Sequence, residues 1–254
     1  MPTLEPINAI LLILAGLAAG VINTFAGSGS LITLPLLMFM GLPPAIANGT
    51  NRVGVVVQNL VATGNFLRQK ELQPKHEWSL ILPTLFGSLL GAFLAVDIKE
   101  DILNYFIGVL LVVMFFVILL KPAEWVKGKA HKERTTKSRW INSILFFFIG
   151  IYGGFIQAGV GLFLLAGLVL GAGYDLIRAN AVKVLMVLSF TLVALVVFLT
   201  AGQIVWSYGL LLAAGNAAGA WIASKYASKI GAKNIRYILL AVVLFSGLKV
   251  LGIF

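Results

Sequence analysis

Residues 23–30 read Asn-Thr-Phe-Ala-Gly-Ser-Gly-Ser, and they separate a long apolar block that ends at Ala26 from a short one that begins at Leu31. Glycine adopts backbone conformations that stop a helix, and it lets main-chain N–H groups approach a ligand. A break of this kind between apolar segments is tolerated in a membrane only where it is buried in protein or lines a wet cavity. The stretch therefore predicts a broken membrane helix, if the rest of the chain is also membrane-embedded.

The composition of the 254-residue chain meets that condition. Apolar residues make up 60% of the sequence and charged residues only 11%, a balance that a water-soluble fold of this size cannot bury. The apolar residues form long blocks, which favours helices over an outer-membrane barrel. These features exclude a soluble enzyme, a disordered scaffold and a secreted domain. Cysteine is absent, which excludes disulfides, thiolate chemistry and cysteine-bound metal.

Ten apolar blocks follow one another along the chain. They cover residues 7–26, 31–41, 45–67, 79–96, 102–120, 141–156, 160–171, 180–200, 206–224 and 235–254. About 20 helical residues are needed to cross a bilayer, so we expect the second and seventh blocks to be broken, tilted or re-entrant helices. We interpret the first block as a retained helix, because no basic segment or cleavage signal accompanies it.

Positive charge is concentrated in a few loops. The chain has 19 Lys and Arg against 9 Asp and Glu, a net charge of +10. Fourteen of the basic residues lie near 68–75, 121–139 and 225–236, and such loops mark the cytoplasmic side of a membrane protein. The pattern predicts that the N-terminus lies outside and the central loop inside. Because the charge follows topology, we expect no nucleic-acid partner.

The two halves of the sequence resemble each other at an offset near 132 residues. Residues 41–48 match 173–180, each stretch ending in Ala-Asn, and 87–92 match 215–220 after a small change of offset. Each half has an odd number of crossings, so the halves are expected to run in opposite directions. Inverted repeats of this kind are typical of secondary transporters, whose substrate sites lie near the midplane at discontinuous helices. The alternative is chance similarity between Gly- and Ala-rich membrane helices.

We therefore predict an all-α polytopic membrane protein built from two inverted-topology repeats of about five helical segments each. The first repeat covers residues 1–120, a basic cytoplasmic linker covers 121–139, and the second repeat covers 140–254. Broken or re-entrant helices are expected in both repeats.

Glycines and uncharged polar residues at the two expected breaks form the first candidate substrate site. Helix N-termini exposed at such breaks favour anions, and hydroxyl and amide side chains add donors. The candidates are Asn23, Gly27, Ser28, Gly29 and Ser30 at the first break, and Gln157, Gly159 and Gly161 at the second. The alternative is a pair of glycine packing kinks, but kinks alone do not explain the polar residues beside each break.

Two basic residues, Arg52 and Lys183, fall inside apolar blocks of opposite halves. A basic side chain inside the bilayer costs roughly 2.5 kcal/mol or more unless it is paired or hydrated, and all nine acidic residues lie in loops, termini or block edges. We expect both to face a cavity that receives an anion; snorkelling to the headgroups is the alternative. This second candidate site comprises Asn48, Thr50, Asn51, Arg52, Asn180 and Lys183.

Enzyme chemistry finds no support in the sequence. The run from Gly27 to Ser30 lacks the third glycine, the strand and the acidic partner of a dinucleotide fingerprint. The two histidines, His76 and His131, lie in charged loops away from any membrane-embedded serine, and no paired intramembrane carboxylates occur. We expect no catalytic residue, no cofactor and no metal.

Taken together, these stretches resemble the sulfite exporter TauE/SafE family, also called the toluene-sulfonate uptake permease family. The resemblance covers essentially the whole chain. It is carried in the first half by residues 27–30, 34–37, 41 and 47–51, and in the second by 150–155, 158–161 and 179–183. It implies a multi-pass permease of the bacterial inner membrane for small sulfur-containing anions such as sulfite, thiosulfate or organosulfonates.

The sequence thus predicts a secondary permease that moves such an oxyanion by alternating access. Its expected partners are a small anionic substrate and the lipid bilayer, and a homo-oligomer is left open. An anion channel and a non-transporting scaffold or accessory subunit are the competing interpretations. Because no carboxylate proton relay is evident, we expect a potential-driven uniport or coupling through protonation of the substrate itself.

Overall fold

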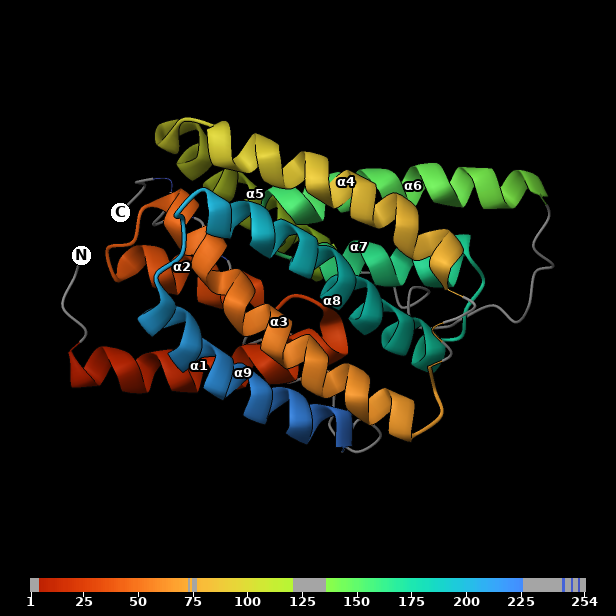
Figure 1. Cartoon of the computed structure of the whole chain (residues 1–254), viewed down its shortest axis with the longest axis horizontal. Coiled ribbons are helices and arrows are strands. Elements are labelled where there is room, and N and C mark those ends of the chain that lie inside the picture. The colour runs from red at the N-terminus through yellow and green to blue at the C-terminus, as the bar shows by residue number, and fades with distance from the viewer. Residues whose placement is uncertain are drawn as a thin grey trace.

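The computed structural model describes residues 5–120 apart from 73, 75 and 76, residues 136–225, and the isolated positions 244, 248 and 251. Within this part of the chain every regular element is helical (Figure 1). The elements are α1 (Pro6–Ala26), α2 (Ser30–Phe39), α3 (Pro44–Arg68), α4 (Trp78–Asp97), α5 (Glu100–Leu120), α6 (Thr136–Phe155), α7 (Val160–Ala166), η3 (Gly167–Gly171), α8 (Leu176–Thr200) and α9 (Trp206–Lys225). The all-α prediction is confirmed for these residues. The tenth predicted block and most of the predicted linker lie outside the described helices.

The described elements include both long apolar helices and short ones, as the block lengths predict. Among the described residues, four helices are long and apolar enough to cross a bilayer, namely α1, α4, α5 and α8. By contrast, α2 has 10 residues and α7 has 7 before the single π-helical turn η3. At 1.5 Å per residue, α2 is about 15 Å long, half of a ~30 Å hydrocarbon core. The second and seventh blocks therefore do not form full-length spans.

Two helices begin earlier than the sequence predicts. Helix α8 begins at Leu176 rather than at residue 180, because Asp175 caps it and accepts a hydrogen bond from the main-chain N–H of Arg178 at 3.0 Å. Arg178 resembles a loop charge in the sequence, yet it lies in the first turn of the helix. Helix α6 begins at Thr136, inside the predicted linker.

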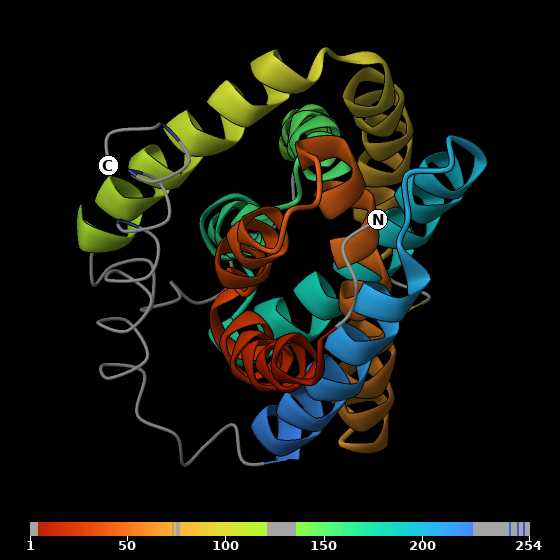
Figure 2. The same ribbon diagram turned by 90° about the vertical axis from the view of Figure 1, so that its left-hand side faces the viewer.

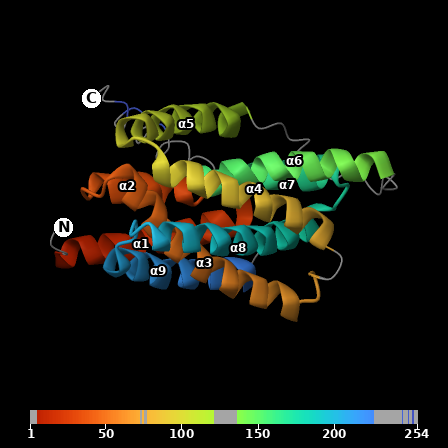
Figure 3. The ribbon, with the colours of Figure 1, turned by 45° about the horizontal axis from the view of Figure 1, so that its top comes forward.

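Close packing joins elements from the two halves of the chain. Helix α4 runs beside α6 and α9 runs beside α1 (Figure 3). A Cβ atom added at any glycine of these contacts would overlap main-chain atoms of the facing helix, so the helices approach backbone to backbone. The glycines are Gly87 and Gly91 on α4, Gly150 and Gly154 on α6, Gly16 and Gly20 on α1, and Gly215 and Gly219 on α9.

The two halves also share details of backbone geometry. Helices α3 and α8 each contain 25 residues, start 132 positions apart, and run in opposite directions (Figure 1). Three pairs of residues with positive φ are separated by the same 132 positions. They are Gly27 and Gly159, Gly41 and Gly173, and Lys70 and Gly202. A turn that needs a left-handed residue therefore recurs at the same place in each half.

The short helices lie near the centre of the bundle, and α5 lies at its periphery (Figure 2). Leu103, Ile107 and Leu111 of α5 are fully buried against the core, whereas Tyr105 and Phe106 are exposed. Exposed aromatic and aliphatic side chains suit a surface whose solvent is lipid. The breaks beside α2 and α7 leave main-chain groups outside regular helix, and such groups need a protein environment or a wet cavity rather than lipid.

Candidate functional site

The first break lies between α1 and α2. Helix α1 ends at Ala26, and Gly27 closes it in the left-handed conformation with φ 70°, donating its N–H to Asn23 O at 2.8 Å. Ser28 and Ser30 are buried. The Ser28 hydroxyl has no hydrogen-bond partner among the described residues. The break thus places a buried hydroxyl without a partner in the described part of the chain directly before the start of α2.

The second break lies between α6 and α7 and has more backbone strain. Gln157 and Gly159 both adopt positive φ, at 60° and 75°, and positive φ is uncommon for a residue such as glutamine. The Gln157 amide nitrogen donates to the Thr191 hydroxyl at 2.5 Å, and its amide oxygen has no partner in the described part of the chain. This strained residue presents a second unsatisfied polar atom.

The two breaks touch each other. The N–H of Gly161 donates to Gly27 O at 3.0 Å. A Cβ on either glycine would overlap the main chain of the other, so only glycine fits at this crossing. Gly29 is held in a similar way, because a Cβ there would overlap Ala19 O of α1. Of the sequence-predicted glycines, Gly27 and Gly161 therefore meet at the crossing point of the broken helices, whereas Gly29 faces α1 and Gly159 faces Met114.

Arg52 of α3 is fully buried and binds the end of α6. Its guanidinium donates to Gly153 O at 3.2 Å, to Gly154 O at 2.5 Å and to the Asn48 side-chain oxygen at 3.4 Å. Asn48 in turn donates to Phe155 O at 2.7 Å. The last carbonyls of a helix lack intrahelical partners and carry partial negative charge. Together Arg52 and Asn48 cap the broken helix of the other half.

Lys183 of α8 does the same for α1. Its ammonium donates to Asn23 O at 3.0 Å, to Thr24 O at 3.1 Å and to the Asn180 side-chain oxygen at 2.6 Å. Asn48 and Asn180 lie 132 positions apart. Each half therefore supplies one cation and one asparagine to the break of the opposite half.

These contacts change the expected partners of the two basic residues. The apolar blocks contain no acidic residue that could pair with them, so the sequence predicts a substrate anion as their partner. In the structure helix-end carbonyls bind the two terminal nitrogens of Arg52 and the ammonium of Lys183. The Arg52 Nε has no hydrogen-bond partner among the described residues. The assignment of Arg52 and Lys183 as direct anion contacts stays a prediction.

Two other candidates lie on α3 beside Arg52. The Thr50 hydroxyl accepts a hydrogen bond from the N–H of Val205 at 2.9 Å, which fixes the entry to α9. Asn51 accepts one from the Thr33 hydroxyl at 2.6 Å, and its amide nitrogen has no partner among the described residues. Thr33 lies in the first turn of α2, so Asn51 joins the first break. Neither Thr33 nor Thr191 was predicted as a site residue, since an isolated threonine in an apolar block gives no signal.

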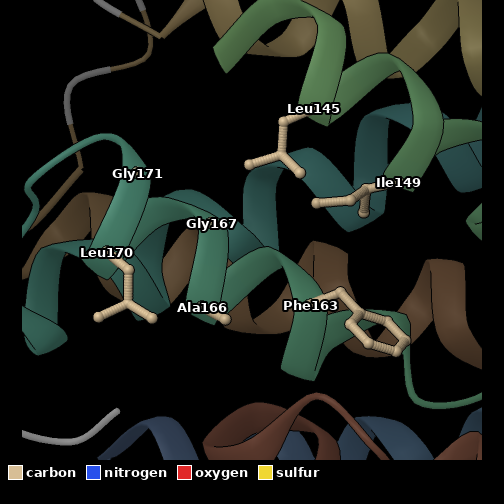
Figure 4. A pocket seen from close by; sticks show the side chains of 7 residues that line it. All are labelled: Leu145, Ile149, Phe163, Ala166, Gly167, Leu170 and Gly171. Atoms are coloured by element: carbon tan, nitrogen blue, oxygen red, sulfur yellow. The ribbon is translucent and has the colours of Figure 1, made fainter. Parts of the chain in front are cut away.

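An apolar hollow of about 410 Å³ lies away from these polar groups, between α6 and α7 with η3 (Figure 4). Its lining residues are Leu145, Ile149, Phe163, Ala166, Gly167, Leu170 and Gly171. None of them has a polar side chain. Because an anion would be desolvated there without a hydrogen-bond donor in return, we place no substrate in this hollow.

Comparison with known proteins identifies the family. The family model for the sulfite exporter TauE/SafE matches residues 12–250. The chain is 30% identical to the probable membrane transporter protein ORF9 of Sinorhizobium sp, over 95% of this chain and 91% of that protein.

Two further relatives have similar names. A probable membrane transporter protein of Haemophilus influenzae is 29% identical over 89% of this chain and 88% of its own length. The probable membrane transporter protein YfcA of Escherichia coli K12 is 28% identical over 91% and 85%. No solved structure matches the chain significantly. The chain therefore belongs to the TauE/SafE sulfite exporter family and is a multi-pass transporter of the inner membrane.

Proposed function

We propose that this transporter is a secondary permease that moves a small sulfur-containing oxyanion, such as sulfite, thiosulfate or an organosulfonate, by alternating access. The observation that carries the proposal is a pair of polar groups without a hydrogen-bond partner among the described residues: the Ser28 hydroxyl, just before α2, and the amide nitrogen of Asn51, which lies on α3 and contacts the first turn of α2 through Thr33. Buried polar groups in proteins normally have partners, and one left unsatisfied costs about 1–3 kcal/mol. A bound oxyanion has oxygens that accept hydrogen bonds from both groups.

The start of α2 also has the electrostatics of an anion site. The helix has 10 residues, its N-cap residue Gly29 makes no side-chain cap, and its first turn contains no acidic residue. The first N–H groups of a helix and its dipole favour negative charge at this position.

The alternating-access mechanism rests on two inverted repeats with the N-terminus outside, as the charge pattern predicts. Four observations support the inverted repeats: the equal lengths of α3 and α8, their opposite directions, the three positive-φ pairs, and the reciprocal capping of each broken helix by the opposite half. Inverted repeats with midplane breaks allow one half to rock against the other around a fixed site.

Binding to purified protein tests the proposed site. Sulfite, thiosulfate, sulfate, taurine and sulfoacetate are added separately to detergent-purified protein, and the midpoint of thermal unfolding is recorded. A ligand at 100 times its Kd raises the free energy of unfolding by about 2.7 kcal/mol. We expect at least one sulfur oxyanion to raise the midpoint, and Ser28→Ala to reduce that shift.

The matched control is Ser189→Ala, because the Ser189 hydroxyl donates to Leu185 O within its own helix at 2.8 Å. This variant is expected to keep the full ligand shift. If no sulfur oxyanion raises the midpoint, or if Ser28→Ala and Ser189→Ala respond alike, the site is not at the start of α2.

A further inference from the structure

A buried carboxylate lies outside the broken-helix site. Glu77 immediately precedes α4, and its side chain has no solvent exposure. Its two oxygens accept from different residues of the second half: Arg178 at 3.1 Å, and the Tyr174 hydroxyl. The Arg178 guanidinium also stacks over the Tyr174 ring, 4.8 Å from its centre. We refer to Glu77, Tyr174 and Arg178 as the Glu77 cluster.

The Glu77 cluster bridges the two halves at one end of the bundle. It joins the start of α4 to the start of α8, on the right in Figure 1. The same end carries Arg68 in the last turn of α3 and Lys225 in the last turn of α9. We call it the basic end.

The corresponding place at the opposite end of the bundle has no charge. Leu42 and Ile46 lie 132 positions before Tyr174 and Arg178, and Val205 precedes Trp206 of α9 as Glu77 precedes Trp78 of α4. Leu42 is buried, and Ile46 and Val205 pack in the same apolar cluster. The opposite junction is thus held by apolar packing and by the neutral hydrogen bond from the Val205 N–H to the Thr50 hydroxyl. Of these two junctions, only the one at the basic end uses an ion pair.

This difference affects how easily each end opens. Separating apolar side chains exposes them to water, which is unfavourable. Separating an ion pair returns both charged groups to water, and their hydration compensates for the lost attraction. Arg178 is already 42% exposed in the closed cluster. The basic end therefore has the chemistry of a contact that can break and re-form.

The cluster is also connected to the broken-helix site. Lys183 lies on α8, five positions after Arg178, and donates to the last carbonyls of α1 beside the first break. Because α8 is a continuous helix, a displacement of its first turn also displaces Lys183. An opening at the basic end would in this way alter the cap of the first break.

We propose that the Glu77 cluster is the gate of the basic end, and that its separation admits water and solute from that side to Ser28. The proposal rests on the alternating-access function above, and it adds the gating residues. It does not depend on which oxyanion is carried.

The test uses the absence of cysteine from the chain. Ser28→Cys introduces a single reporter thiol at the first break, and a membrane-impermeant methanethiosulfonate reagent is applied to one face of the membrane at a time. With Glu77→Gln added, we expect the labelling rate from the basic end to rise about tenfold, as a shift of the closed-to-open equilibrium predicts. Labelling from the opposite face is expected to stay unchanged. No sulfur anion is present, so the result is independent of the proposed cargo.

A control in the same segment separates gating from general loosening. Ser189→Ala removes a side-chain hydrogen bond within α8, eleven positions after Arg178, and it should leave the labelling rate at the value of Ser28→Cys alone. Tyr174→Phe removes one hydrogen bond to Glu77 and serves if Glu77→Gln fails to fold; its labelling is expected to rise, by less. The gate is refuted if the folded variants of the Glu77 cluster label at the parent rate, if labelling rises equally from both faces, or if Ser189→Ala reproduces the effect.

Discussion

The positive charges of Arg52 and Lys183 are compensated by the partial negative charges of main-chain carbonyl groups. Each donates to carbonyls at the end of a helix from the opposite half, and no carboxylate takes part in the hydrogen bonds described for them. The sequence predicted two basic residues inside the apolar blocks, and the structure buries both of them. It could not predict the partner, because every residue has a carbonyl group and only the three-dimensional helix ends determine which carbonyls lack a bond.

Arg52→Ala is expected to destabilise the protein. The substitution removes the donors to Gly153 O and Gly154 O and leaves these carbonyls unsatisfied in the interior. We expect a loss of about 3 kcal/mol, the range for hydrogen bonds to a buried charged group. The midpoint of thermal unfolding in detergent measures it. Arg68→Ala is the control, since Arg68 is exposed in the last turn of α3, and it should change the stability by less than about 0.5 kcal/mol. Equal stability of the two variants would contradict the capping role.

At the scale of the elements, the fold depends on two short helices whose starts meet. The glycine runs predicted both breaks to within a few residues, because a left-handed backbone conformation is what glycine supplies. The sequence did not indicate that Gly27 and Gly161 touch, since that contact joins residues 134 positions apart. It also placed Glu77 at the edge of an apolar block without revealing its burial, because a charged residue beside a helix start is usually solvated.

Alanine substitutions at glycine separate steric contact from backbone strain. Gly161→Ala places a Cβ into the main chain of Gly27, whereas Gly41 has φ 88° and no atom within 4 Å of the position that a Cβ would take. We expect Gly41→Ala to lose about 1–2 kcal/mol from left-handed strain alone. Gly161→Ala should lose the folded, monodisperse protein on size-exclusion chromatography. Similar behaviour of both variants would show that the main chains of Gly27 and Gly161 do not pack as closely as in the structure.

At the scale of the whole molecule, neither half forms a complete site. Helix α4 of the first half packs on α6 of the second, and α9 of the second packs on α1 of the first. Each broken helix is capped by residues of the other half of the chain. The offset of 132 residues and the distribution of charge predicted two related halves. The reciprocal contacts could not be predicted, because sequence similarity between halves does not state which helix of one packs on which helix of the other.

Counterflow in proteoliposomes tests the proposed permease most directly. Purified protein is reconstituted, the vesicles are loaded with sulfite or thiosulfate, and uptake of the same radiolabelled anion is followed. We predict saturable uptake that unlabelled anion inside the vesicles accelerates, and that Ser28→Ala reduces at least tenfold, the effect of losing about 1.4 kcal/mol of binding. Uptake that rises linearly with concentration and does not depend on the internal anion would indicate a channel. The absence of uptake by folded protein would indicate a scaffold. Either result contradicts a carrier with its site at the first break.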